Sequence, residues 1–278
     1  IPGLVLAIGM LTVPRTPRWL MQQNREDEAR GVLEKLRSED KKADISGEIS
    51  DIRKANKEES SHRVGELFSR KIRPLIWIGL ALAVFQQFVG VNTVIYYAPT
   101  ILADTGLTNS ASVTQAVFVG VTNVVFTIVA VLLLDRVGRR TLLLIGTVGL
   151  TLSLALLGIY FAVPALQHGA PWLALTGLMI YIASFAIGLG PVFWLMISEI
   201  FPTGVRSKAM AVCTMANWAA NFIVAGSFLT LSAAITRSGT FFLYTARGGV
   251  AFLIFMWRVP ETKNRSLEKI QAELVGSS

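Results

Sequence analysis

The stretch that decides the fold class is TLLLIGTVGLTLSLALLGIYFAVPALQHGAPWLALTGLMIYIASFAIGLGPVFWLMI, residues 141–197. It contains no Lys, Arg, Asp or Glu, and His168 is its only histidine. About 20 apolar residues of helix cross the hydrocarbon core of a bilayer, so this stretch is long enough for two crossings. Because lipid offers the backbone no hydrogen-bond partners, such segments must be helical. The stretch therefore predicts an all-α, polytopic membrane protein.

The same apolar character extends over much of the remaining chain. Residues 74–134 hold one charged side chain, Asp104, and the whole sequence is 53% hydrophobic and 16% charged. A soluble domain of this length needs more charged surface than that. Hydropathy predicts six membrane spans, at about 72–102, 112–134, 141–163, 171–201, 207–235 and 239–259.

The net charge of +8 does not indicate a nucleic-acid partner. More than half of the 26 Lys and Arg residues lie in residues 1–73, interleaved with two-thirds of the 18 acids. Such a mixture is typical of solvated helix faces rather than of a phosphate-binding groove. The remaining basic residues lie mainly in alternate connectors between the spans. The positive-inside rule therefore predicts that the polar segment and the C-terminus are cytoplasmic in a plasma-membrane protein.

Four regions are expected along the chain. Residues 1–13 are interpreted as the end of a preceding transmembrane helix, which suggests a piece of a longer protein. Residues 14–70 form a cytoplasmic helical linker, residues 71–259 a six-helix bundle, and residues 260–278 a cytoplasmic tail. One cysteine, Cys213, and two histidines give no catalytic or metal-binding constellation, so neither enzyme activity nor a metal or other cofactor is predicted.

The first and fourth predicted spans are longer than a bilayer requires and contain helix-breaking residues. Gly90 and Pro99 interrupt the first span, and Gly188, Gly190 and Pro191 interrupt the fourth. Interrupted spans often surround a transport site, because irregular backbone within the membrane is tolerated where it lines a cavity. A simple packing kink explains the breaks equally well.

The segment QQFVGVNTVIYY, residues 86–97, places three amides and two phenols within the first span. At roughly 100° per residue, Gln86 and Asn92 point about 240° apart on an ideal helix. They can face one pocket only if the helix unwinds near Gly90. A neutral pocket of this kind suits a ligand rich in hydroxyl groups. The alternative is that the amides hydrogen-bond neighbouring helices to one another.

Six strings in order identify a family resemblance. They are PRTPRWL (14–20), QQFVGVNTVIYY (86–97), DRVGRR (135–140), GPVFW (190–194), SEIFPTGVR (198–206) and VPETKNRSLE (259–268). Together they resemble the sugar porter family of the major facilitator superfamily over nearly the whole chain. The resemblance implies the C-terminal six-helix bundle of a sugar transporter, plus the linker helices before it.

The resemblance also implies which side chains contact the sugar. They are Gln86, Gln87, Asn92, Asn123, Trp194 and Asn217, with Tyr96 and Tyr97 closing over the ligand from outside. Gln87 and Asn92 are the foremost of these. Trp194 as a packing aromatic, Asn217 as a cap and Asn123 as an interhelical contact remain as alternatives.

A second set of residues is implied to act in gating. Asp135, Arg136, Arg139, Arg140, Glu199 and Arg206 match a salt-bridge cluster that holds such carriers outward-open. Anchoring of the arginines at the membrane interface is the alternative. Arg247 lies inside the last span with no acid in that span, and the sequence offers no account of it beyond snorkelling.

The resemblance predicts a secondary transporter that moves a hexose or pentose by alternating access. Its expected partners are a sugar, the lipid bilayer and a second six-helix half, with protons as well if the carrier is a symporter. The sequence does not separate symport from facilitated diffusion. Two alternatives stay open: a major facilitator carrier of another small solute, such as a polyol or an organic ion, and a non-transporting sugar receptor.

Overall fold

The computed structural model describes residues 3, 9–11, 13–36, 44–61, 64–70, 72–96, 109–202 and 204–263. Within these ranges the regular structure is helical, with no β-strand. The chain divides into two compact units. The first comprises residues 1–66 with 202–207, and the second comprises residues 67–201 with 208–278.

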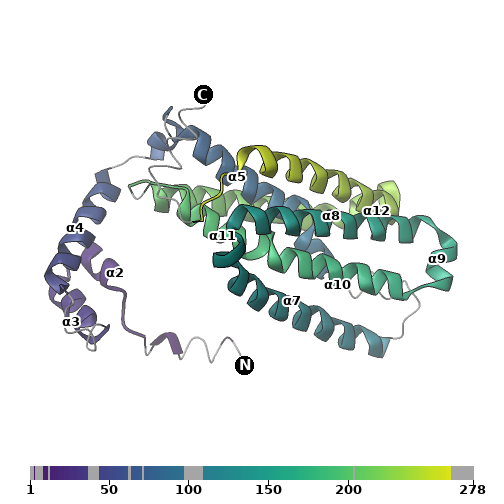
Figure 1. Ribbon diagram of the computed structural model, residues 1–278, viewed down its shortest axis with the longest axis horizontal. Coiled ribbons are helices and arrows are strands. Elements are labelled where there is room, and N and C mark those ends of the chain that lie inside the picture. The colour runs from purple at the N-terminus through teal and green to yellow at the C-terminus, as the bar shows by residue number, and fades with distance from the viewer. Residues whose placement is uncertain are drawn as a thin grey trace. The chain divides into compact units, whose positions relative to one another are not determined.

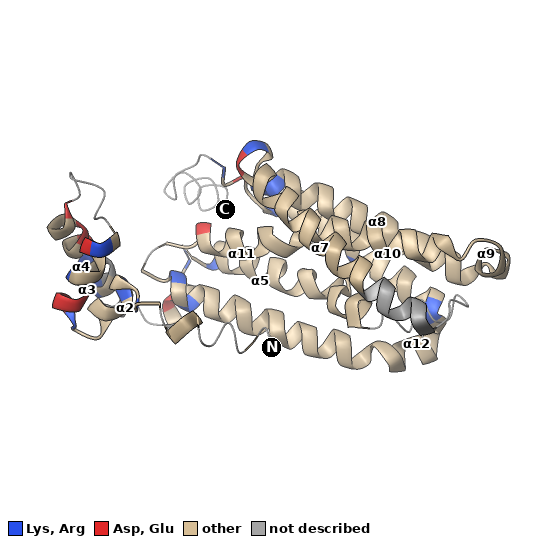
Figure 2. Cartoon of the chain, turned by 90° about the horizontal axis from the view of Figure 1, so that it is seen from below, with Lys and Arg blue, Asp and Glu red and all other residues tan. Residues whose placement is uncertain are grey.

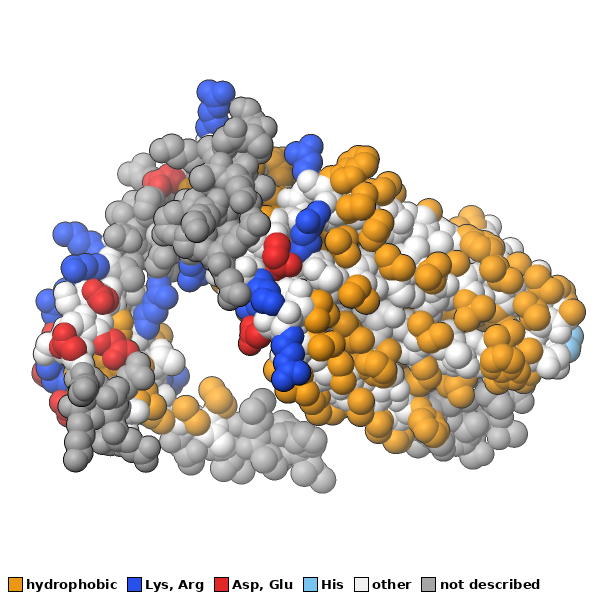
Figure 3. Space-filling view, viewed as in Figure 1, with side chains coloured by type: hydrophobic (Ala, Val, Ile, Leu, Met, Phe, Trp, Pro, Cys, Tyr) orange, Lys and Arg blue, Asp and Glu red, His pale blue; other side chains and the backbone are white. Residues whose placement is uncertain are grey.

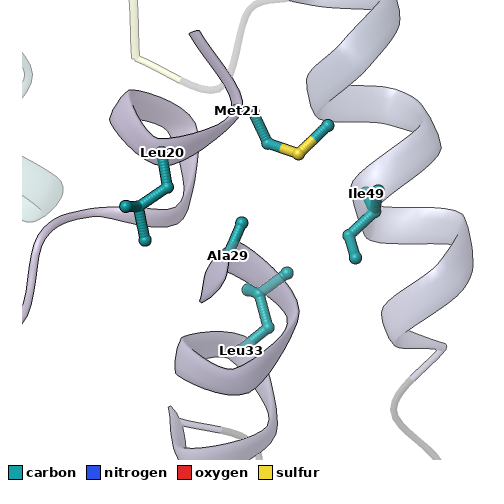
Figure 4. Packing of buried hydrophobic residues seen from close by; sticks show 5 residues of the cluster. All are labelled: Leu20, Met21, Ala29, Leu33 and Ile49. Carbon is teal, nitrogen blue, oxygen red and sulfur yellow. The ribbon is translucent and has the colours of Figure 1, made fainter. Parts of the chain in front are cut away.

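The first unit contains three helices of the predicted linker: α2 (Pro17–Gln22), α3 (Glu26–Leu36) and α4 (Ile45–Ser61). Thr16 caps α2 by accepting a hydrogen bond from the Trp19 amide at 3.3 Å. The three helices meet in a small apolar core (Figure 4) made of Leu20, Met21, Ala29, Leu33 and Ile49. An ion pair between Glu26 and Arg53 joins α3 to α4 at the surface. The linker is therefore folded within its described residues.

The second unit contains the long apolar helices (Figure 1). After a 3₁₀ turn at Val64–Phe68, which spans the boundary between the units, come α5 (Arg73–Phe88), α7 (Asn109–Val137), α8 (Arg139–Ala162), α9 (Pro164–Gly169), α10 (Trp172–Ile187), α11 (Leu189–Glu199) and α12 (Arg206–Arg258). The first two residues of α12 belong to the first unit. The short helix α9 was not predicted from the sequence.

Five stretches are long and apolar enough to cross a membrane: Arg73–Tyr96, Val117–Val137, Arg139–Ala162, Trp172–Glu199 and Arg206–Arg258. The last consists of two helical segments, because Ile235 and Thr236 have non-helical backbone angles, with φ of −120° and +67°. It accounts for both the fifth and the sixth predicted spans. The expectation of an all-α, polytopic membrane protein is thus confirmed.

The surface of the bundle is also that of a membrane protein. Apolar side chains recur along α7 at helical spacing, with Val124, Ile128 and Leu132 all exposed. Figure 3 shows hydrophobic side chains over the visible face of the bundle. In the bundle, Figure 2 shows charged residues where α7 meets α8, where α11 ends and on α12. An apolar flank with charge gathered mainly at the helix ends is the pattern that lipid favours, and Arg247 inside the last span is an exception.

Both predicted helix breaks are present. The fourth span breaks at Gly188, between α10 and α11. This glycine packs so tightly on α8 that a Cβ added to it would lie 2.8 Å from the Gly146 Cα atom. The first span breaks at Val89 and Gly90, and helix resumes at residues 91–96. Pro99, the other expected breaker of that span, lies outside the described residues.

Candidate functional site

The break in the first span positions the candidate site. Gly90 adopts a φ of +83°, a left-handed conformation that side chains disfavour. The ring of Tyr244 occupies the space beside it, since a Cβ on Gly90 would lie 2.6 Å from that ring. The Tyr181 hydroxyl donates to the Val89 carbonyl at 2.9 Å, which satisfies an acceptor freed by the unwinding. The break is therefore packed and hydrogen-bonded on both sides.

Unwinding brings together amides that an ideal helix would separate. Asn92 Nδ2 donates to Gln87 Oε1 at 3.0 Å, across the break, and to Asn221 Oδ1 of α12 at 2.9 Å. Gln87 Nε2 donates to Asn217 Oδ1, also on α12, at 3.1 Å. We call Gln86, Gln87, Asn92, Asn217 and Asn221 the amide cluster.

One end of the amide cluster is buried and fully paired. Gln86 and Asn217 are 3% and 2% exposed. Gln86 Nε2 donates to the Leu189 carbonyl at 2.8 Å, beside the break in the fourth span. Asn217 Nδ2 donates to the Ala83 carbonyl at 2.9 Å and to Gln86 Oε1 at 2.6 Å. These two amides join α5, α11 and α12, as the alternative of interhelical hydrogen bonding anticipated, while also supporting the residues beside them.

The other end of the amide cluster keeps hydrogen-bonding capacity. Among the described residues, nothing donates to Asn92 Oδ1 and the Asn221 Nδ2 group has no acceptor. Neither atom belongs to the buried unpaired polar atoms of the described chain. A carbonyl oxygen and an NH₂ group on two amides that are hydrogen-bonded to each other can bind the hydroxyls of a polyol, which both donate and accept. We call this pair of atoms the open end.

Asn221 was not among the residues singled out from the sequence. It follows Asn217 by four positions, and residues at i and i+4 share a face of a helix. That spacing was the available signal.

The remaining predicted sugar contacts make no hydrogen bond with the amide cluster in the described structure. Trp194 lies on α11 and is 43% exposed, and its ring is inclined at 60° to that of Phe193 with 4.7 Å between the centroids. Tyr96 is exposed at the end of the first span. Asn123 on α7 accepts a hydrogen bond from Thr127 through its backbone carbonyl, at 2.7 Å. Tyr97 lies outside the described residues.

The predicted gating residues other than Arg206 lie around the start of α8 and the end of α11. Arg139 bonds to Glu199 of α11 at 3.2 Å and to Asp135 of α7 at 3.1 Å. The Arg139 and Glu199 side chains are 15% and 27% exposed, whereas Asp135 is 86% exposed. Since solvent screens exposed pairs, the Glu199 contact is the stronger of the two. Thr262 Oγ1 donates to the second Glu199 oxygen at 2.5 Å.

Glu261 adds an acid that the sequence reasoning did not assign to this set. Its carboxylate accepts from the backbone amides of Arg139 and Arg140, at 2.9 and 3.1 Å. These amides begin α8, and the positive end of a helix dipole favours an anion there. We call Asp135, Arg139, Glu199 and Glu261 the charged cluster.

Two of the other predicted gating arginines, Arg140 and Arg136, take part in hydrogen bonds that a backbone carbonyl accepts. Arg140 donates to the Met256 carbonyl of α12. The Arg136 carbonyl accepts from Lys263 Nζ at 2.6 Å, while its own side chain is exposed. Arg206 belongs to the first compact unit and so is not placed relative to the charged cluster.

Comparison with known families decides the assignment. The model of the family described as "Sugar (and other) transporter" matches residues 1–274. The chain belongs to this sugar transporter family. The resemblance drawn from the six strings is thereby confirmed.

Individual members of the family are similar over nearly all of this chain. The metabolite transport protein YwtG of Bacillus subtilis (strain 168) is 41% identical over 274 residues, which cover 99% of this chain and 59% of YwtG. The D-xylose transporter of Levilactobacillus brevis is 38% identical over 277 residues, which cover 99% of this chain and 60% of the relative. The chain thus spans about three-fifths of these sugar transporter family members.

A solved structure of a sugar transporter shares the fold. It is the major facilitator superfamily proton:xylose symporter XylE bound to 6-bromo-6-deoxy-D-glucose, with a TM-score of 0.79 and 33% identity. The match covers 98% of this chain and 57% of XylE. The resemblance to a major facilitator fold therefore extends to three dimensions.

Proposed function

We propose that this chain forms one wall of the substrate site in a secondary transporter that moves a hexose or pentose by alternating access. The observation that carries the proposal is the open end of the amide cluster, between the break in the first span and α12. Its atoms come from Asn92 and Asn221, and no charged side chain belongs to the cluster. Neutral amides favour a neutral ligand with several hydroxyls over an organic ion.

The relatives support the same substrate class. One is a D-xylose transporter, and the solved structure is a proton:xylose symporter holding a deoxyglucose derivative. The exposed ring of Trp194 suits the C–H face of a sugar, because an indole offers a flat apolar surface and an N–H donor. Gln86 and Asn217, both among the predicted contacts, act in this proposal mainly by holding Gln87 and Asn92 in place.

The remaining wall of the site is proposed to come from a second six-helix half, as the resemblance implies. In secondary transporters the substrate lies between two structural repeats, and these repeats move around it. The proposal also places the linker and the C-terminus in the cytoplasm of a plasma-membrane carrier, on the basic connectors that end the spans. The proposal does not specify whether sugar transport is coupled to protons, and uptake in the presence of a protonophore measures this.

The direct test is uptake by cells that express the complete protein. Labelled D-xylose and D-glucose are supplied with and without a protonophore, and uptake by cells carrying the empty vector is subtracted. We expect saturable uptake of at least one of the two sugars. A protonophore that stops accumulation indicates symport, and one without effect indicates facilitated diffusion. Uptake of neither sugar, together with uptake of an organic ion, would contradict the proposal.

The charged cluster is proposed to act as the cytoplasmic gate. Replacing Glu199 with glutamine removes the charge of its contact with Arg139 and preserves its shape. A partly buried pair of this kind biases a two-state equilibrium by about 1 kcal/mol, which is roughly fivefold in population. We expect the initial rate of sugar uptake to fall several-fold while the sugar Kd changes by less than about threefold.

The matched control for this variant is Asp135→Asn, which removes the exposed member of the charged cluster. Because that pair is screened by solvent, its loss should change the uptake rate by less than about twofold. The gate assignment fails if Glu199→Gln weakens sugar binding as much as a substitution in the amide cluster does.

A further inference from the structure

The last span carries a cation in an otherwise apolar stretch. Arg247 lies near the middle of the helical segment 237–258 and is partly buried. Within the described part of the chain it forms no ion pair. An ionised side chain at this depth of a spanning helix is costly unless a local contact compensates, and such residues are commonly functional.

The compensating contact is aromatic. The Arg247 guanidinium carbon lies 5.3 Å from the centroid of the Phe88 ring and 5.4 Å from that of Tyr244. A cation at this distance is attracted by the ring's quadrupole, and the attraction grows where water is excluded. Phe88 belongs to α5 and Tyr244 to α12, so the guanidinium links the two helices.

These two rings lie at the break in the first span. Phe88 is the last residue of α5, and the turn at Val89 and Gly90 follows it directly. The Tyr244 ring also packs against Gly90, where it fills the space of a Cβ. Arg247 therefore contacts one residue that flanks the break and a second that covers it.

The amides of the candidate site lie immediately around the same break. Gln87 precedes Phe88, and Asn92 lies two residues after Gly90. Their mutual hydrogen bond of 3.0 Å spans the turn. Any rotation of the backbone at Gly90 changes the angle between the two amides, and hence the direction in which the Asn92 carbonyl oxygen points.

We propose that Arg247 is a positioning residue, which holds Phe88 and Tyr244 together and so fixes the break that aims Gln87 and Asn92 at the ligand. The inference rests on the proposed function in that it takes this ligand to be a sugar. A plain anchoring role, in which the guanidinium only secures the last span in the bilayer, leaves the break unaffected. The two roles differ in a measurable way.

The first measurement is hydrogen–deuterium exchange of the complete protein, followed at the amides of residues 89–94. Arg247→Met keeps the length of the side chain and removes the cation, while Phe88→Leu removes one ring. We expect exchange at these amides to rise about tenfold in both variants. Arg247→Lys should stay within about threefold of wild type, since an ammonium also binds aromatic faces. Arg258→Met, which removes an exposed arginine from the same helix, should leave the exchange rates at residues 89–94 unchanged.

The second measurement is equilibrium binding of labelled D-xylose and D-glucose to the same proteins. We expect Arg247→Met to raise the Kd about tenfold with the number of sites per folded molecule unchanged. In a protein that already carries Asn92→Ala, Arg247→Met should raise the sugar Kd much less, because the amide that Arg247 positions is absent.

Unchanged exchange in both Arg247→Met and Phe88→Leu, or faster exchange with an unchanged Kd, would overturn the proposal. A wild-type protein that binds neither sugar would contradict the proposed function instead, and the exchange data would still decide whether Arg247 fixes the break.

Discussion

Replacing Gln87 with alanine is expected to raise the sugar Kd by about two orders of magnitude. The substitution leaves Asn217 Oδ1 without its donor at 3.1 Å, and Asn92 Nδ2 loses one of its two acceptors, the one at 3.0 Å. Asn92 then keeps only its hydrogen bond to Asn221, so its free oxygen is no longer held in one direction. The unpaired Asn217 oxygen destabilises the fold by about 1–3 kcal/mol. The affinity falls because the sugar contacts of the open end are lost, and about 2.7 kcal/mol of lost binding free energy corresponds to a factor of 100 in Kd.

Equilibrium binding of labelled sugar to the purified complete protein measures this effect. Gln167→Ala is the matched control, because Gln167 is also an amide that donates to a backbone carbonyl, at 3.1 Å from Phe161 O, but lies on α9 outside the amide cluster. We expect the control to keep the wild-type Kd. If Gln87→Ala bound sugar like wild type, or if the control lost as much affinity, the amide cluster would not be the binding site.

Replacing Gly90 with alanine is expected to be among the most destabilising substitutions in the bundle. Alanine at a φ of +83° costs about 1–2 kcal/mol in backbone strain. Its Cβ would also lie 2.6 Å from the ring of Tyr244, and overpacking of this kind costs about 1–3 kcal/mol more. We expect a clear fall in the thermal midpoint, and a weaker sugar affinity in the protein that remains folded.

Thermal unfolding of purified wild type and variants checks this prediction. Gly120→Ala on α7 is the control, because a Cβ there meets no atom within 4 Å and alanine favours a helix. It should unfold at or slightly above the wild-type temperature. Equal midpoints for the two variants would mean that the break at Gly90 relaxes easily, and the site would then lack the rigid support that we infer.

The fold class was predictable because it depends on local properties. Absence of charge over residues 141–197 indicates helices in lipid whatever their neighbours are. The break at Gly90 was expected for a more specific reason, since Gln86 and Asn92 could not share a pocket on a continuous helix. The structure resolves that problem through the hydrogen bond of Asn92 to Gln87, five positions apart.

The pairing of side chains across helices was not predictable from one sequence. Gln86 was predicted to contact sugar, yet its amide donates to the Leu189 carbonyl, 103 positions away. No local pattern indicates which of two neighbouring amides turns toward another helix and which toward a cavity. Glu261 illustrates the same limit, because its partner is the start of α8, more than 120 positions earlier.

Within the described residues, Arg247 is stabilised by aromatic rings rather than by the acidic partner that a buried arginine usually has. The last span contains no acid that could pair with it, so the sequence alone suggests only snorkelling. The structure instead provides two aromatic rings, one of them from a different helix. Cation–π partners are not evident in a sequence, because aromatic residues in a spanning helix are common and carry no charge.

A structure of the complete protein with a bound sugar would show directly whether the amide cluster binds the substrate. We expect sugar hydroxyls at about 3 Å from Asn92 Oδ1 and Asn221 Nδ2, the two groups of the open end. We also expect the hydrogen bonds of Gln86 to the Leu189 carbonyl and of Asn217 to the Ala83 carbonyl to remain in place. A sugar bound elsewhere in the bundle, with the open end in contact with water alone, would contradict the proposed site.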